Sequence, residues 1–456
     1  MTIASRPNTD IKSDILDDRK ESIAYGKSGG SICCEKNSVS GAVSQRACVY
    51  SGARVVLNPI TDAVHIVHGP IGCASYTWDI RGSLTGGSSL FRNSFSTDLA
   101  ERDVIFGGAE KLTRAVDEAA ALYNPKLIFI YATCIVGVIG DDVEAVCREA
   151  EKRHKIRVIP VKSAGFSGNK SLGYRLACEA IMKIISNGAG VSFRQGVNIL
   201  GDFNLAGEIW IIESYFRKLG IPVKSVITGD SSYERLLKAP SAALNIVQCA
   251  GSMTYLAKRM EEEFGIPYIK VSFFGMEDTS SALLRSAEAL QNEEAVKRAE
   301  AFIKEEEEAL IPFNAAYRPY LEGKRAAVYV GGGFKAISLV RQFASMGIKT
   351  VVVGTQTGQA EDYAILAGLV GDNAVILDDA NPAELETFMK EKGADILVGG
   401  VKERPLAYKL GIAFCDHNHE RKHPLAGYAG VRCFTKEIHL SMNSPVWGYL
   451  SQEAFA

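Results

Sequence analysis

The chain has 456 residues, of which 47% are hydrophobic and 23% are charged. At about 150 residues per domain, this length predicts about three domains. The composition is that of a folded globular chain, which excludes disorder along the whole length. The 51 basic and 53 acidic residues nearly cancel, and this balance argues against a nucleic-acid-binding protein, because such proteins carry a basic excess or patch.

The cysteines and the lack of long apolar stretches indicate a reducing compartment. No stretch of the sequence approaches the roughly 18 uninterrupted apolar residues of a membrane span, and the N-terminal segment lacks the apolar core of a secretory signal. We therefore expect a cytoplasmic protein that makes no membrane contact. The ten cysteines are then not expected to form a disulfide framework. Most should be buried thiols, and the others are candidate metal or cluster ligands.

Strands and helices alternate along the chain after a polar first segment, residues 1–45, which we expect to be a flexible extension. The apolar run 126–134 predicts a buried parallel strand. A helix is predicted over 141–154, with aspartates at its start that suit a helix N-terminus. The next strand is predicted over 156–161. A strand, helix and strand in this order favour a parallel sheet with a right-handed crossover.

The same pattern starts again twice. Strands are predicted over 196–203, 221–229 and 244–251, and a long charged connector helix over 284–310. A third cycle begins over 325–354 and continues with strands over 373–379, 394–400 and 411–416. The sequence therefore predicts an α/β fold with three doubly wound, Rossmann-like parallel-sheet domains, over 46–195, 196–320 and 321–456. Ligands of such sheets bind at the carboxyl ends of the strands.

Three cysteines stand next to glycine or at a predicted strand end: Cys48, Cys73 and Cys134. Thiolates bind iron–sulfur clusters, and glycine lets the backbone approach the sulfides. Three cysteines are one short of the usual four, so the fourth ligand would come from another residue or another chain. Cys249 ends a further predicted strand. Each cysteine taken alone also fits a buried core thiol, which is common in proteins.

Two other motifs have weaker interpretations. The segment GGGFK at 331–335 follows a strand and opens a helix, but it lacks the P-loop spacing and only loosely resembles the dinucleotide-binding pattern. It leaves a nucleotide-dependent dehydrogenase as a remote alternative. The histidines 417, 419 and 423 do not have a standard zinc spacing, and a polar surface loop is the competing interpretation.

Taken together, the motifs resemble those of the nitrogenase component 1 family. They include VHGPIGC (67–73), DVIFGG (103–108), IGDD (139–142), GDFNLAGE (201–208), NIVQCAGSM (245–253) and HERKHPLAGYAG (419–430). The resemblance extends from about residue 46 to the C-terminus. It implies three doubly wound α/β domains around a cluster cavity, which agrees with the strand pattern.

Within the family, the pattern is closest to the α-type subunits of the scaffolds on which the iron–molybdenum cofactor matures. The resemblance implies that Cys48, Cys73 and Cys134 bind a 4Fe–4S cluster whose fourth ligand comes from the partner subunit. It implies that Cys249 binds the iron–sulfur precursor of the cofactor. The other residues matched to the lining of the cofactor cavity are Arg81, Lys170, Tyr174, Ser252 and Lys402.

The departures from the catalytic subunits favour a scaffold over a catalyst. Asn418 stands where catalytic subunits carry the histidine that binds molybdenum, and His417 and His419 flank it as candidates for transient ligation or as polar loop residues. Lys170 and Tyr174 stand where catalytic subunits carry glutamine and histidine. Loss of an imidazole that could donate protons predicts little or no dinitrogen reduction. The cation of Lys170 suits an anionic precursor or homocitrate.

The expected function is therefore cofactor assembly. The scaffold would receive an iron–sulfur precursor from a donor protein and hold it while molybdenum and homocitrate are inserted with the help of the nitrogenase reductase (the iron protein). It would then pass the product to apo-nitrogenase. The implied assembly is an α2β2 heterotetramer with a NifN-like β-type subunit. The alternatives are a catalytic α-subunit of a nitrogenase-like reductase and the scaffold of a vanadium-type system.

Overall fold

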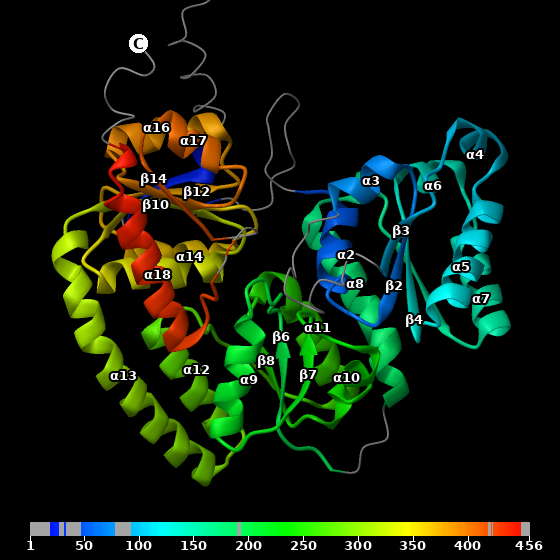
Figure 1. The fold of residues 1–456 in the computed structure, drawn as a ribbon, viewed down its shortest axis with the longest axis horizontal. Helices are drawn as coiled ribbons and strands as arrows, with labels where there is room; N and C mark the ends of the chain where they lie inside the picture. Colours follow the sequence, from blue (N-terminus) through cyan, green and yellow to red (C-terminus); the bar gives the residue numbers. More distant parts are fainter. Residues whose placement is uncertain are drawn as a thin grey trace, which may run out of the picture. The chain divides into compact units, whose positions relative to one another are not determined.

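The structure is a computed structural model that describes residues 19–26, 32, 47–77, 93–188, 193–417, 421 and 423–447. The chain divides into two compact units. One unit comprises 1–46, 308–420 and 431–456, and the other comprises 47–307 and 421–430. The strands form three sheets (Figure 1), and the prediction of an α/β fold with parallel sheets is confirmed. The domain boundaries expected near 195 and 320 stay predictions.

The unit formed mainly by 47–307 contains two four-stranded sheets. The first has the order β3-β2-β4-β5, and every neighbouring pair is parallel. Its strands are β2 (Ala63–His68), β3 (Ser94–Ser96), β4 (Leu127–Ala132) and β5 (Arg157–Lys162). Its helices are α2 (Val49–Leu57), α3 (Ile71–Tyr76), α4 (Glu101–Phe106), α5 (Ala109–Tyr123), α6 (Cys134–Ile139), α7 (Val143–His154) and α8 (Lys170–Ile185). The 3-10 turn η4 (Gly165–Ser167) precedes α8.

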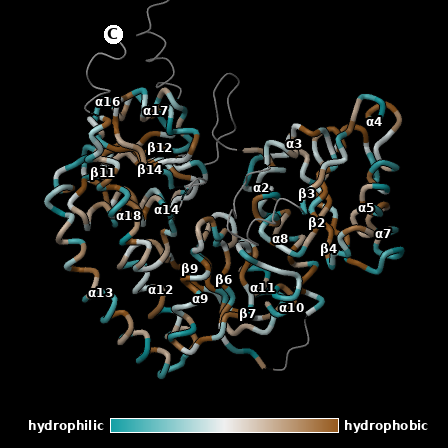
Figure 2. Tube along the Cα trace, viewed as in Figure 1, coloured by the Kyte–Doolittle hydropathy of each residue, from teal (hydrophilic) through white to brown (hydrophobic). Residues whose placement is uncertain are grey.

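Strand β4 is buried on both faces, which explains why its sequence is apolar throughout. Phe129 and Tyr131 pack in a core with side chains of α2 and α8. Ile128 and Ile130 pack in a second core with side chains of α5 and α7. Figure 1 shows these two helix pairs on opposite faces of the sheet, and Figure 2 shows the strongly apolar character of strands β2 and β4 between them.

The second sheet has the order β7-β6-β8-β9 and is also parallel. Its strands are β6 (Val197–Leu200), β7 (Val223–Ile227), β8 (Leu244–Val247) and β9 (Tyr268–Lys270). Its helices are α9 (Glu208–Lys218), α10 (Tyr233–Leu237), α11 (Ala250–Phe264) and α12 (Met276–Ala289). Helix α11 packs against α8 of the first sheet, and side chains of both sheets share one apolar core. The two sheets therefore form one compact unit.

The third sheet belongs to the other unit and has the order β1-β12-β11-β10-β13-β14. Its strands are β1 (Ile23–Tyr25), β10 (Arg325–Val330), β11 (Lys349–Thr355), β12 (Val375–Asp378), β13 (Ile396–Gly399) and β14 (Ala413–Asp416). The helices α14 (Gly333–Ser345), α15 (Ala360–Leu369), α16 (Pro382–Lys392) and α17 (Arg404–Lys409) connect them. Helix α18 (Gly427–Met442) follows, with residues in both units. All strand pairs are parallel except β1 with β12.

Two expectations differ from the structure. Residues 19–26 lie in the segment 1–45 that we expected to be flexible, yet β1 pairs with β12. The Arg19 guanidinium contacts the buried Glu384 carboxylate at 2.9 Å and holds residues 19–26 to α16 as well. The connector helix predicted over 284–310 is two helices, α12 and α13 (Glu293–Leu321). Gln291 between them has a φ of +53°, and the Asn292 side chain accepts the Ala295 N–H at 3.0 Å, so a new helix begins there.

Helices in the described part of the chain are all too short or too polar to cross a membrane.

Helix α2 packs on α8, and this contact positions the segments at the carboxyl edge of the first sheet. At Gly52, a Cβ would overlap the Lys170 carbonyl oxygen on α8. At Gly173, a Cβ would overlap the Val49 carbonyl and lie 2.7 Å from the Ala53 nitrogen on α2. The two backbones therefore touch directly, and glycine is required at both positions.

We predict that Gly173→Ala lowers the stability of the unit that contains it. The added methyl group meets backbone atoms that cannot rotate away, and overpacking of this kind costs about 2 kcal/mol, or roughly 5 °C in the midpoint of thermal unfolding. Gly368→Ala on α15 is the matched control, because its Cβ meets nothing within 4 Å. This control should be neutral or slightly stabilising, as alanine is in an open helical position. Calorimetry of both variants checks the prediction, and equal midpoints would contradict it.

Candidate functional site

Three cysteines from three separate segments meet at the carboxyl edge of the first sheet. Cys48 is the residue before α2, Cys73 lies in α3, and Cys134 is the first residue of α6. Gly165 lies between two of them. Its N–H donates to Cys134 Sγ at 3.1 Å, and a Cβ at Gly165 would lie 3.0 Å from Cys134 Sγ and 3.6 Å from Cys48 Sγ.

The Cys73 thiol belongs to the same group. Burial raises the pKa of Cys73, and the neighbouring Cys134 and Cys48 thiols raise it further, against a hydrogen bond with Thr133 that lowers it. Electrostatic coupling of this kind requires the thiols to be close to one another. Cys48 and Cys73 are half-buried and Cys134 is exposed, so the group is open to the surface on the Cys134 side.

The sequence predicted Cys134 at a strand end, and the structure places it one step further, at a helix start. Strand β4 ends at Ala132, and Thr133 is the N-terminal cap residue of α6. Thr133 donates both its N–H, at 3.2 Å, and its hydroxyl, at 3.0 Å, to the His68 carbonyl at the end of β2. Gly69 must be glycine, because a Cβ there would overlap the Thr133 side chain. The ends of β2 and β4 are therefore fixed to each other beside the cysteines.

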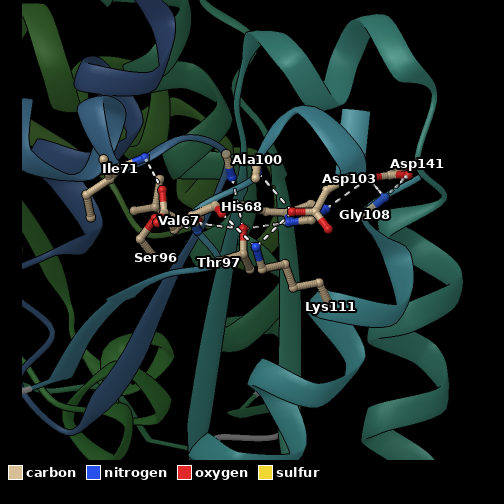
Figure 3. Close-up of polar contacts among 12 residues, drawn as sticks. Val67, His68, Ile71, Ser96, Thr97, Ala100, Asp103, Gly108, Lys111 and Asp141 are labelled. Atoms are coloured by element: carbon tan, nitrogen blue, oxygen red, sulfur yellow. Dashed lines mark hydrogen bonds and ion pairs between the residues drawn. The ribbon is translucent and has the colours of Figure 1, made fainter. Parts of the chain in front are cut away.

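A polar network continues from this junction (Figure 3). His68 Nε2 lies 3.1 Å from Asp141 Oδ2, and His68 Nδ1 lies 3.0 Å from the Thr97 hydroxyl. The Gly108 N–H donates to both Asp141 carboxylate oxygens at 3.0 Å. Burial lowers the pKa of His68, and the hydrogen bond and charge of Asp141 partly oppose that shift. The ring is therefore neutral near physiological pH and acts as a bridge between Thr97 and Asp141.

Helix α3, which carries Cys73, is held at its start by a neighbouring loop (Figure 3). The Ile71 N–H donates to Asp98 Oδ1 at 3.2 Å. Lys111 donates to the Asp98 carbonyl at 2.7 Å and to Asp103 Oδ2 at 2.8 Å. The loop that follows β3 therefore fixes the first turn of α3 and also contacts α4 and α5.

Cys249 lies at the corresponding edge of the second sheet, at the N-terminus of α11. Gly201, after β6, approaches it so closely that a Cβ would lie 2.8 Å from Cys249 Cβ. The preceding Gln248 is buried and donates to Asp202 Oδ2 at 2.9 Å. Ser252 is buried in the first turn of α11, and its carbonyl accepts the Cys178 thiol of α8 at 3.6 Å. The Cys249 site is thus anchored on the helix that also packs against α2.

Lys170 and Tyr174 lie in the first turns of α8. The Lys170 ammonium is 5.9 Å from the centre of the Tyr174 ring, and the Tyr174 side chain is buried in the shared core. Lys170 follows Asn169, which pairs with Cys48 in an isolated bridge. Lys170 is therefore next in the chain to a residue that contacts the three-cysteine group.

The remaining predicted site residues lie elsewhere or outside the described chain. Lys402 is exposed in the turn between β13 and α17, and His417 follows β14, buried, with its N–H donating to the Gly399 carbonyl at 2.8 Å. These two residues belong to the other compact unit, at the carboxyl ends of neighbouring strands. Arg81, Asn418 and His419 lie outside the described residues.

Sequence reasoning found the three cysteines but missed the residues that hold them in place. Gly165, Thr133 and the pair His68 and Asp141 were not assigned a role, although HGPIGC and IGDD were recognised as motifs. The available signal for Gly165 was its position shortly after the predicted strand 156–161, because ligands of such sheets bind at the carboxyl ends of the strands. The His68–Asp141 contact had no such signal, because 73 positions separate the two residues.

Comparisons with known proteins agree on one family. The family model described as nitrogenase component 1 type oxidoreductase matches residues 48–443. The nitrogenase iron–molybdenum cofactor biosynthesis protein NifE of Clostridium pasteurianum is 62% identical over 96% of this chain and 97% of its own length. NifE of Methanosarcina barkeri is 49% identical over 96% of this chain and 98% of its own. The solved structure described as nitrogenase Cp1 at pH 5 superposes with a TM-score of 0.88 at 31% identity, over 95% of this chain and 96% of that one.

We predict a graded reactivity of the thiols in the metal-free full chain. Cys134 is exposed and should be alkylated first. Cys73 should react more slowly near neutral pH, because burial and its neighbours raise its pKa and only the thiolate reacts. Cys147 and Cys178 should stay unmodified until the chain unfolds, since burial raises the pKa of each to about 12.

Pulse alkylation followed by peptide mass spectrometry gives the order. The Cys73 rate should still rise with pH above the usual thiol pKa of about 8.5. Fast modification of Cys147 in the folded chain would contradict the burial that the structure gives it.

Proposed function

This chain belongs to the nitrogenase component 1 family, and from that premise we propose that it is the α-type subunit of a scaffold for assembly of the iron–molybdenum cofactor. The grouping of Cys48, Cys73 and Cys134 around Gly165 is the structural observation that carries the proposal. Two of its relatives, at 62% and 49% identity, are NifE proteins. The cysteines must stay reduced for this role, so we place the protein in the cytoplasm.

The three cysteines fit a resident 4Fe–4S cluster by two observations. The donor set consists of thiols, the ligands that such clusters require. Gly165 leaves open the space that a side chain would fill between Cys134 and Cys48, and its N–H donates to Cys134 Sγ, a contact that tunes cluster potentials. Within the described ranges, acidic, histidine and cysteine side chains do not gather in threes around a position for a single metal ion. A 4Fe–4S cluster does not need such a position, because each of its thiolates binds a different iron. When bound, the cluster supplies one-electron transfer.

A NifN-like partner subunit would cover the open side of this site and supply the fourth thiolate. Large apolar side chains are exposed on the two helices that carry Cys73 and Cys134 and on the turn that contains Gly165: Ile71 at 57%, Val138 at 74% and Phe166 at 65%. Phe166 lies against α6, because a Cβ at Gly137 would be 3.1 Å from its ring. Exposed apolar groups gathered on one edge mark a protein interface. We propose an α2β2 assembly in which this edge is the α–β contact.

The cargo of the scaffold would be an iron–sulfur precursor held by Cys249. The cysteine stands at a helix N-terminus, where the backbone dipole favours a thiolate or an anionic cluster, and Ser252 lies in the first turn of α11. Molybdenum and homocitrate would be added there with the help of the iron protein, after a donor protein has delivered the precursor. The product would then pass to apo-nitrogenase. The cofactor roles of Lys402, His417, Arg81, Asn418 and His419 stay predictions.

The side chains near the start of α8 favour assembly over catalysis. Tyr174 replaces the histidine of catalytic subunits, and imidazole is the side chain that exchanges protons near neutral pH. The Tyr174 ring is buried, with the Lys170 ammonium 5.9 Å from its centre. A cation at this position attracts an anionic cargo, whereas reduction of dinitrogen needs a proton donor.

We predict that the chain, co-expressed with its NifN-like partner and purified without oxygen, contains iron well above the four atoms of one 4Fe–4S cluster and reduces little dinitrogen. Counting iron, molybdenum and vanadium and assaying substrate reduction on one sample test this. Stoichiometric heterometal with high activity would instead identify a catalytic subunit. Vanadium in place of molybdenum would identify the scaffold of a vanadium-type system.

We further predict that Cys48→Ala, Cys73→Ala or Cys134→Ala removes the resident cluster, because each leaves one iron without its thiolate. Iron content and the electron paramagnetic resonance signal of the reduced complex should both fall. Cys147→Ala is the matched control, since this thiol of α7 is buried in the core and lies on none of the segments that carry the three cysteines. Unchanged iron and signal in the three variants would refute the ligand assignment.

A further inference from the structure

One residue, His68, contacts both ends of the helix that begins with Cys134. At the start of α6, the Thr133 N–H and hydroxyl both donate to the His68 carbonyl. Beyond the end of α6, the Asp141 carboxylate lies 3.1 Å from the His68 ring. The ring and the carbonyl of a single residue therefore fix the position of α6, as Figure 3 shows for the Asp141 end.

His68 is also connected to Cys73. It is the last residue of β2, and the chain runs from it through Gly69 and Pro70 directly into α3. The Gly69 N–H donates to the Thr97 hydroxyl at 3.2 Å, and the same hydroxyl lies 3.0 Å from His68 Nδ1. A consistent set of donors has the hydroxyl donating to Nδ1 while Nε2–H donates to Asp141. The turn that leads to Cys73 is thus tied to the same ring.

Asp141 is also held by Gly108, the residue that precedes α5. The Gly108 N–H donates to both its carboxylate oxygens. A Cβ at Gly108 would lie 2.7 Å from Asp141 Oδ2 and 3.0 Å from His68 Cε1, so only glycine allows this approach. The His68 side chain is 0% exposed and that of Asp141 6% exposed. Hydrogen bonds in such a water-poor place are strong, and an unpaired group left there is costly.

We propose that His68 and Asp141 are positioning residues that set the spacing between the Cys73 and Cys134 thiols, so that the site accepts and retains its cluster. Neither side chain is a ligand, and each acts through the segments that carry the ligands. The inference rests on the proposed function, because it assumes that these cysteines bind a cluster. Residues that orient ligands from outside change metal affinity by about 10–100-fold when they are altered.

The test compares variants in the complex with the partner subunit, purified without oxygen. Asp141→Ala should speed iron loss to a chelator by about tenfold and alter the electron paramagnetic resonance signal of the reduced cluster. Asp141→Asn retains an acceptor for Gly108 and a polar partner for His68, and it should restore most of the wild-type behaviour. Val116→Ala is the control, since Val116 is buried in the core on the same face of the sheet but lies on α5, which carries no cysteine. It should lower thermal stability but leave the iron-loss rate and the signal unchanged.

The possible outcomes distinguish failure of this inference from failure of the proposed function. Equal iron loss and identical spectra in Asp141→Ala and Val116→Ala would show that the pair only stabilises the fold and would overturn the proposal. If Asp141→Ala yields no folded complex, His68→Gln replaces it. Its single amide group cannot bridge Asp141 and Thr97 as the ring does, so iron loss should again be faster, and a wild-type rate would overturn the proposal. A wild-type complex that contains no cluster would refute the proposed function itself.

Discussion

Both candidate sites depend on the direct backbone contact between α2 and α8 at Gly52 and Gly173. Helix α2 begins after Cys48, and α8 begins five residues after Gly165, so their contact brings the first thiol to the glycine that separates it from Cys134. On its other side, α8 packs against α11, whose first turn follows Cys249. Packed interiors transmit strain because they have few voids. A shift between α2 and α8 would therefore be felt at Cys48 and, through Cys178 and Ser252, at Cys249.

The three-cysteine site is fixed by hydrogen bonds on the side of the sheet and exposed on the opposite side. Beneath the cysteines, the ends of β2 and β4 are joined by Thr133 and by the buried pair of His68 and Asp141. Above them, Cys134 is exposed among apolar side chains such as Val138 and Phe166. An apolar surface around a thiol is unfavourable in water, and burial of that surface by a partner removes the cost. The same contact would complete the ligand set, so assembly of the complex and completion of the cluster site are one event in this scheme.

The sequence predicted what depends on local patterns and missed what depends on contacts between distant segments. Apolar runs such as 126–134 identified the buried parallel strands, and neighbouring glycines or a strand end singled out the cysteines. The break between α12 and α13 was missed because the helical pattern is nearly continuous, and only the backbone of Gln291 and the cap at Asn292 end it. Strand β1 was missed because three residues in a polar segment carry no periodicity. Gly165 and His68 were missed as site residues, since their roles come from neighbours 31 and 73 positions away.

The comparison with a nitrogenase structure separates what the fold requires from what the chemistry requires. A TM-score of 0.88 at 31% identity means that nearly the same backbone is built from mostly different side chains, and function then resides in the site. The close contacts at Gly52 and Gly173 are made between backbones, and they would be the same for a scaffold and a catalyst. The required strength of cluster binding differs, because a catalyst keeps its cofactor through many turnovers, whereas a scaffold must release its product. In the proposed scheme the precursor is held by Cys249, and the Lys170 ammonium, 5.9 Å from the centre of the buried Tyr174 ring, adds an electrostatic attraction. Attraction of this kind falls with distance and screening, so it would strengthen the hold on an anionic precursor and still allow its release.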